Sequence, residues 1–291
     1  MNSGTGFGTD GVVTTEIDSE SPESRHWYTF GIFVASTLTY SWGLWALLVF
    51  GIVPASATTP LILLGGFGPF VGALVTLRLT GLSVRTWLRS NLRYRLSLRW
   101  YALAVVLPPI LIVASSIIYV TVFDASYAFD ELAALWMFPL GLALTFAVGG
   151  GNEELGWRGF AQPALQEGLS AFTASVLIGF VWFVWHIPLF FVPGSSQAGV
   201  PMVPYAVGVL ATAVVLTWLY NATGSLLIPW LYHASINPAG GYFLAGVDSL
   251  KTTPGYGTYA LVVAIVAVAL LVRYGPTDLA ARARVRLSDL T

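Results

Sequence analysis

The sequence predicts an all-α fold, a polytopic transmembrane helix bundle with about eight spans. Two observations lead to this fold class. Of the 291 residues, 56% are hydrophobic and only 9% are charged, whereas a soluble globular protein carries about 25% charged residues. Apolar stretches long enough to cross a bilayer, about 20 residues each, also recur along the whole chain. We therefore expect one membrane domain and no separate soluble unit.

Eight apolar segments are the candidate spans. Most are uninterrupted runs of aliphatic and aromatic residues, whereas the second and the seventh contain several glycine or proline residues. The segments are 27–52, 60–77, 100–123, 132–154, 169–191, 203–220, 225–243 and 256–272. They predict a membrane domain over 27–275, with a disordered polar tail over 1–26 before it and a basic tail over 276–291 after it.

The basic residues predict the orientation of the bundle, because lysine and arginine stay on the cytoplasmic side of a membrane. An even number of spans brings both termini to one face. That face then carries 12 of the 13 basic residues, Arg158 among them, and only Lys251 falls opposite. We therefore expect an integral protein of the cell membrane with both termini in the cytoplasm.

The segment 81–100 alternates arginine with leucine, tryptophan and tyrosine. This pattern is typical of an amphipathic helix that lies along the membrane surface. The alternative is a solvated basic loop, and neither interpretation assigns chemistry to the segment.

Composition excludes several kinds of chemistry. The formal net charge of -1 gives no attraction for nucleic acid, so the lipid bilayer is the only large partner expected besides a substrate. Cysteine is absent, which removes disulfides, thiolate nucleophiles and cysteine metal sites. The first 26 residues are acidic, unlike the basic start of a cleavable signal peptide. The first apolar segment is therefore expected to remain as an anchor.

Three groups of polar residues lie within apolar segments, where each ionisable side chain costs on the order of a few kcal/mol to bury. The first group is Glu153, Glu154 and Arg158. In a helix, Glu154 and Arg158 are i,i+4 neighbours with the acid first, the favourable order for an ion pair. Glu153 points about 100° away and stays free to accept a proton as a general base. The alternative is that all three are surface charges at a helix end.

Two histidines define the other groups. His186 follows a run of aromatic residues, and Pro188 ends the helix just beyond it, which opens backbone groups near the imidazole. His233 and Asn237 are i,i+4 and project from one helix face. They suit a metal ion or a developing oxyanion, although each group, taken alone, also fits hydrogen bonding between helices. Three such groups in one bundle indicate an active site.

The three groups together resemble the CAAX prenyl endopeptidase and bacteriocin-processing family, also called the ABI family, of intramembrane proteases. The resemblance covers 132–243. The motifs that carry it are Glu153-Glu154-x-x-x-Arg158-Gly159, aromatic-x-x-x-His186 and His233-x-x-x-Asn237. The family usually has phenylalanine four residues before the histidine of the second motif, where this chain has Trp182.

The resemblance implies an endopeptidase that cleaves a membrane-associated protein or peptide near the membrane surface, in some members after a prenylated cysteine. It implies that Glu153 activates the water with help from His186. His233 and Asn237 would hold the oxyanion, and the ion pair of the first motif would brace the site.

The resemblance leaves two catalytic types open. Glu153, His186 and His233 would supply the three ligands that a catalytic zinc needs beside its open position. No His-Glu-x-x-His helix is present to pair a metal site with its base. Metal-free chemistry with no cofactor is therefore the prediction, and a zinc metalloendopeptidase is the alternative.

Two functions from other classes compete with the protease. A catalytically silent membrane scaffold, such as an immunity protein, would keep the fold without the chemistry. A proton-coupled carrier also uses intramembrane acids and histidines, but such proteins usually show repeated halves, and the sequence has no such repeat.

The predicted depths of Glu153 and His186 disagree. Glu153 lies at the cytoplasmic end of its segment, whereas His186 lies about 15 residues along its own, roughly 20 Å deep. The two meet only if the fourth segment continues past Glu153 at membrane depth or if the fifth is tilted. The glycines at 149–151 are where the backbone is expected to bend.

Overall fold

A computed structural model describes residues 22–291, so most of the tail expected over 1–26 lies outside the described residues. Helices and short connections make up the described chain, in which no strand is present. The predicted all-α fold is therefore confirmed. The helices are α1 (Pro22–Val49), α2 (Thr58–Gly65), α3 (Gly68–Leu79), α4 (Val84–Asn91), α5 (Leu98–Phe123), α6 (Met137–Val148), α7 (Glu154–Gly156), α8 (Gln162–Leu165), α9 (Ala171–His186), α10 (Met202–Thr223), α11 (Leu227–Ala239) and α12 (Thr253–Tyr274).

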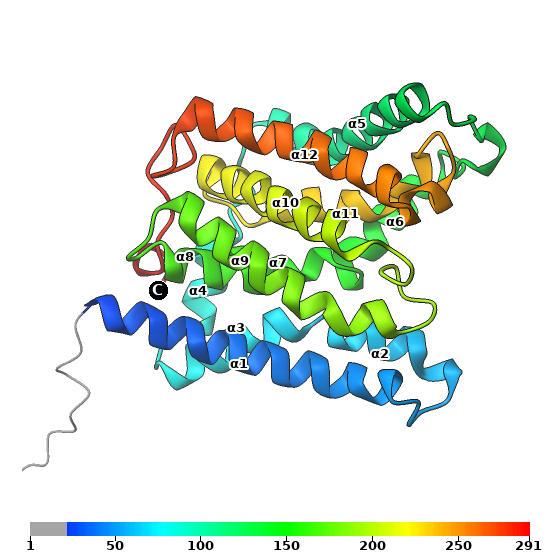
Figure 1. The fold of residues 1–291 in the computed structure, drawn as a ribbon. Helices are drawn as coiled ribbons and strands as arrows, with labels where there is room; N and C mark the ends of the chain where they lie inside the picture. The colour runs from blue at the N-terminus through cyan, green and yellow to red at the C-terminus, as the bar shows by residue number, and fades with distance from the viewer. Residues whose placement is uncertain (1–21) are drawn as a thin grey trace, which may run out of the picture.

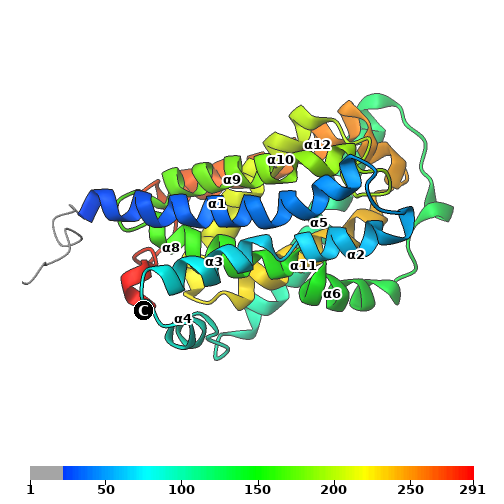
Figure 2. The same ribbon diagram turned by 90° about the horizontal axis from the view of Figure 1, so that it is seen from below.

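The longest helices run along one axis of the bundle (Figures 1 and 2). Five of them are long and apolar enough to cross a membrane, namely those containing α1, α5, α9, α10 and α12. The pair formed by α2 and α3 is bent by 43° and makes a sixth candidate. The protein is thus an integral membrane protein by the length and composition of its helices.

The expected number of eight spans is not confirmed. Each predicted segment does contain helix, but α6 and α11 have only 12 and 13 residues. Such helices are about 18–20 Å long, short of the hydrocarbon core of about 30 Å. Apolar composition predicted correctly that these two segments contain helix. It overestimated the length of the helices, because the chain bends or changes direction inside each predicted segment.

The bundle has two ends, on the left and right of Figure 1. The terminal end holds residue 22, the C-terminus and the connections 80–97, 166–170, 224–226 and 275–291. The distal end holds the connections 50–57, 124–136, 187–201 and 240–252. Backbone hydrogen bonds join connections at each end: Ala171 N donates to Thr277 O at 2.8 Å, and Ala128 N donates to Leu244 O at 2.8 Å.

Charged side chains are divided between the two ends. Lys251 lies at the distal end with the acids of 124–131 and Asp248. Arg158, which the charge distribution places among the residues of the cytoplasmic face, is fully buried inside the bundle and is therefore not a surface charge. The arginines in or beside the connections of the terminal end are Arg78, Arg85, Arg89, Arg93, Arg95, Arg99, Arg273, Arg282, Arg284 and Arg286.

The basic segment 81–100 forms a helix only over α4. Trp87 is buried while Arg85 and Arg89 are exposed, so α4 is amphipathic as expected. The Trp87 indole donates to Gly159 O at 2.7 Å, which attaches α4 to the bundle. The residues from 92 to 97 are not helical.

A group of buried aromatic rings joins α1 to the middle of the molecule. Phe33 contacts Trp157 edge to face, with ring centroids 5.4 Å apart. Trp157 in turn contacts Trp185 at 6.0 Å, and Trp185 contacts Trp45 at 4.8 Å. A β-carbon at Gly156 would lie 2.2 Å from Pro69 O, so α7 and α3 approach more closely than any larger residue allows.

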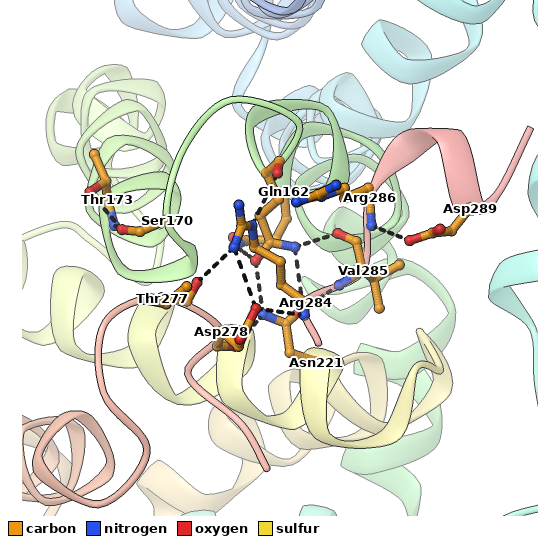
Figure 3. A network of polar contacts seen from close by, with 11 residues as sticks. Gln162, Ser170, Thr173, Asn221, Thr277, Asp278, Arg284, Val285, Arg286 and Asp289 are labelled. Carbon is orange, nitrogen blue, oxygen red and sulfur yellow. Dashed lines mark hydrogen bonds and ion pairs between the residues drawn. The ribbon is translucent and has the colours of Figure 1, made fainter. Parts of the chain in front are cut away.

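The C-terminal segment 276–291 packs against the terminal end (Figure 3). Leu279, Val285, Leu287 and Leu290 in this segment are buried. Asn221 on α10 donates from Nδ2 to Asp278 O at 2.9 Å. The basic tail predicted over these residues is therefore part of the packed structure.

Candidate active site

The acidic motif lies on a broken helix. After α6 the chain bends at 149–151, where Gly150 has a φ of 125°, in a region that favours glycine. A 3-10 turn (Gly151–Glu153), α7, a π-helical turn (Trp157–Ala161) and α8 follow. In Figure 1, α7 lies between α6 and α8 along the bundle axis. The fourth segment thus continues past Glu153. This continuation is one of the two arrangements that would allow Glu153 and His186 to meet, the other being a tilt of the fifth segment.

Glu154 is the centre of a buried charge cluster. Its Oε1 lies 3.1 Å from Arg158 Nη1, and both side chains are fully buried. The same oxygen lies 2.8 Å from His233 Nδ1. The predicted i,i+4 pair is therefore present, and it reaches a third residue on α11. The Arg158 guanidinium also stacks over the Trp182 ring, 5.0 Å from its centroid.

Glu153 faces away from this pair. Its Oε2 accepts a hydrogen bond from Trp182 Nε1 at 2.8 Å. The residue is 6% exposed, and none of the ion pairs of the described residues includes it. Glu153 is therefore a nearly buried acid without a cationic partner, in agreement with the separation of roles expected from helix geometry.

His186 ends α9 and is held by the backbone of its own helix. Its Nδ1 lies 2.8 Å from Trp182 O. A carbonyl oxygen only accepts, so Nδ1 donates, and Nε2 of the neutral ring keeps its lone pair. The rings of Trp185 and Tyr205 contact the imidazole edge to face at 4.7 and 5.6 Å. These contacts leave Nε2 as the atom that can receive a proton.

His233, Asn237 and Glu153 surround the space beside Gly150. A β-carbon there would lie 3.2 Å from His233 Nε2, 3.2 Å from Asn237 Nδ2 and 3.7 Å from Glu153 Oε1. Asn237 Nδ2 also donates to Gly149 O at 2.6 Å, which leaves its second N–H free to donate. Three polar atoms from two distant segments therefore face one point.

One cavity of about 390 Å³ unites four of the six residues expected at the site. Glu153, His186, His233 and Asn237 all line it. Glu154 and Arg158 do not line it and lie fully buried. The site thus consists of polar atoms that face the cavity and of the buried Glu154–Arg158 pair behind them. His233 connects the two parts, because it lines the cavity and contacts Glu154.

Sequence reasoning missed one polar contact of the site. Trp182 was noted only as an aromatic residue in the place where the family has phenylalanine. The indole N–H that phenylalanine lacks donates to Glu153, and the ring lies under Arg158. The substitution itself was the available signal, because tryptophan adds a hydrogen-bond donor at that position.

Glu153, His186 and His233, the ligands that the zinc alternative would use, are not grouped closely in the structure. Within residues 22–291, no group of three His, Cys, Asp or Glu side chains is close enough to share a metal ion. The Nδ1 atoms of His186 and His233 are each engaged by an oxygen of the protein, so only their Nε2 atoms would be available as ligands. The spacing of these side chains in the structure does not match the three-ligand set of a catalytic zinc.

The groups that face the cavity match the needs of hydrolysis. Glu153 offers a proton acceptor in the cavity that His186 also lines, and general-base catalysis requires an acceptor within reach of a water. Asn237 and His233 offer nitrogen atoms around the same point, and N–H donors stabilise an oxyanion. The arrangement can therefore add water to a carbonyl group.

The comparisons with known proteins agree with the resemblance expected from the motifs. Residues 135–239 match the family model described as type II CAAX prenyl endopeptidase Rce1-like. A CAAX prenyl protease 2 of Methanococcus maripaludis is 33% identical over 122 residues, which cover 40% of this chain and 43% of that relative. The chain thus spans less than half the length of the relative. The matched range 135–239 contains all six residues expected at the site.

Proposed function

We propose that this chain is an intramembrane endopeptidase, because residues 135–239 match the family model described as type II CAAX prenyl endopeptidase Rce1-like. It hydrolyses a peptide bond of a membrane-associated protein or peptide. The observation that carries the proposal is the single cavity lined by Glu153, His186, His233 and Asn237. A membrane scaffold or an immunity protein has no need for buried charges arranged around a cavity.

Glu153 is the general base of the proposed reaction. The hydrogen bond from Trp182 holds Oε2, which leaves Oε1 to accept a proton from the attacking water. His186 Nε2 accepts the second hydrogen bond of that water. The water oxygen bonds to the carbonyl carbon, the C–N bond then breaks, and Glu153 returns the proton to the leaving nitrogen.

Asn237 and His233 stabilise the oxyanion. The N–H of Asn237 that does not reach Gly149 donates to it. His233 Nδ1 lies 2.8 Å from Glu154 Oε1, which orients the ring, and Nε2 donates to the oxyanion when it carries a proton. Arg158 in turn offsets the charge of Glu154 and fixes its position.

Substitution of Glu153 by glutamine tests the proposal. Because the relative from Methanococcus maripaludis is named a CAAX prenyl protease, the probes are quenched fluorescent peptides ending in a CAAX motif, farnesylated and unmodified. Glu153→Gln removes the proton acceptor and keeps the shape, so we expect turnover to fall by about 100-fold or more at an unchanged melting temperature.

Glu167→Gln is the matched control for this experiment, because Glu167 lies in a connection of the terminal end and is exposed. It should keep the turnover of the wild type. Full turnover by Glu153→Gln would contradict the assignment of the base. Wild type without turnover on either probe, in a folded state, would favour the scaffold.

We also propose that the reaction needs no metal, since Glu153 can activate the water directly. Purified protein should keep its turnover in the presence of a strong chelator. About one equivalent of zinc, lost in His186→Ala or His233→Ala, would overturn this part of the proposal and favour the zinc enzyme.

A further inference from the structure

The walls of the cavity all belong to the distal half of the molecule. Trp45 lies near the last turn of α1, His186 ends α9, and Tyr256 and Tyr259 lie in the first two turns of α12. The connection 187–201 adds Ser196. No residue from the connections 80–97, 166–170, 224–226 or 275–291 lines the cavity.

The exposed residues of the cavity wall are at the same end. Ser196 and Asn237 are exposed, and the Lys251 side chain is 52% exposed while it pairs with Asp248 at 2.8 Å. The groups that face the substrate in the proposed reaction, by contrast, are 6% exposed at Glu153 and at His186. Access to the buried acid therefore runs inward from the distal end.

Packed side chains close the opposite route. Beyond Glu153 toward the terminal end lie the fully buried Glu154–Arg158 pair and then the fully buried Gln162 and Gln166. The C-terminal segment 276–291 covers this part of the bundle with buried leucine and valine side chains. A peptide cannot reach Glu153 from the terminal end without displacing these elements.

Apart from the buried Arg158, the arginines of the described chain lie at the terminal end, whereas the distal end carries one lysine and the acids Asp124, Asp130, Glu131 and Asp248. Basic residues remain on the cytoplasmic side of a membrane. This distribution makes the terminal end cytoplasmic and the distal end extracytoplasmic.

We infer that this enzyme takes its substrate from the extracytoplasmic face of the membrane. The substrate is a peptide segment of an exported or membrane-anchored polypeptide that enters the cavity at the distal end, past Ser196 and Lys251. The inference rests on the proposed function, and it adds the side of the membrane on which the cleaved bond lies.

Single-cysteine variants test the orientation, because the chain has no cysteine of its own. Ser196→Cys marks the distal end and Arg85→Cys, on α4, marks the terminal end. In sealed spheroplasts, a membrane-impermeant maleimide should modify Ser196→Cys and should modify Arg85→Cys only after permeabilisation. Lys251→Cys repeats the distal measurement on a different connection, in case one variant fails to accumulate. Modification of Arg85→Cys in sealed spheroplasts would overturn the inference.

Sealed vesicles of the two orientations test the side of cleavage. The unmodified quenched CAAX peptide, which does not cross the membrane, is added outside, and Glu153→Gln supplies the background rate. Right-side-out vesicles should cleave the peptide, whereas inside-out vesicles should cleave it only after detergent is added. Turnover by intact inside-out vesicles alone would overturn the inference and leave the proposed function standing. Wild type without turnover even in detergent would contradict the proposed function and the inference together.

Discussion

Two buried polar clusters lie next to each other along the same broken helix, and they differ in how well their atoms are paired. The acid–histidine cluster consists of Glu153, Glu154, Arg158, His186 and His233. Within the described chain, Glu154 Oε2 and the Nε and Nη2 atoms of Arg158 are buried without a hydrogen-bond partner. The cluster thus holds charge that its surroundings do not fully satisfy.

The amide cluster consists of Gln162, Gln166, Thr217 and Asn221, and its side chains are fully paired. Gln162 Nε2 donates to Gln166 Oε1 at 2.9 Å, and Thr217 donates to Gln162 Oε1 at 3.0 Å. Asn221 Nδ2 donates to Gln166 Oε1 at 2.8 Å. Asn221 Oδ1 accepts from Val285 N at 3.2 Å, which attaches the C-terminal segment (Figure 3).

The difference in hydrogen bonding between the two clusters indicates that the amide cluster serves stability and the acid–histidine cluster serves chemistry. A buried neutral network that is fully paired holds elements together at little cost. Buried charges are expensive even when paired, and apolar residues of similar volume would serve stability as well or better. A cluster that exists to pack helices would resemble the amide cluster. The charges of the acid–histidine cluster are therefore best explained by the proposed catalytic role of this site.

Loss of the Glu154 charge should have the largest effect on stability. Glu154→Gln keeps an oxygen near Arg158 and His233 but leaves the buried guanidinium without its counterion. We expect a loss of about 3–5 kcal/mol in the free energy of unfolding, seen as lower yield and a lower melting temperature in detergent, and Arg158→Ala should behave alike. The double variant Glu154→Gln/Arg158→Met should recover much of the loss. A single variant as stable as the wild type would show that this pair is not a costly buried charge pair.

Loss of one amide should have an intermediate effect. Asn221→Ala leaves Val285 N and Asp278 O of the C-terminal segment without their partner and removes one of the partners of Gln166. Unsatisfied buried polar groups cost about 1–3 kcal/mol each. Protease should then cleave 276–291 more readily, while turnover stays within a few-fold of the wild type. Thr173→Ala, which removes only an exposed contact to Ser170, is the control. A large loss of turnover in Asn221→Ala without a loss of stability would show that the amide cluster also takes part in the reaction, contrary to this prediction.

The exposed ion pair at the distal end should have the smallest effect on stability. The side chains of Lys251 and Asp248 are 52% and 83% exposed, and such pairs contribute at most about 1 kcal/mol. Asp248→Asn should therefore leave the melting temperature nearly unchanged, at low and at high salt. A shift as large as that of Asn221→Ala would mean that the connection 240–252 depends on this pair.

The sequence by itself determined the features that depend on neighbours along the chain. Apolar runs predicted helix in all eight segments, because hydrogen bonds within a helix satisfy the backbone without water. The i,i+4 spacing predicted the Glu154–Arg158 pair and the shared face of His233 and Asn237, because 3.6 residues per turn align such positions. The motifs built from these spacings also predicted the resemblance to the family whose model matches residues 135–239.

Only the tertiary structure decided how these local pieces meet. The bend at Gly150 and the continuation through α7 and α8 bring Glu153 to the cavity that His186 also lines, which no count along a straight segment predicts. Trp182 and Glu153 are 29 residues apart, and Gln166 and Val285 are 119 apart. Such contacts depend on which helices pack together. The same packing buried Arg158, which the distribution of charge alone had assigned to the surface.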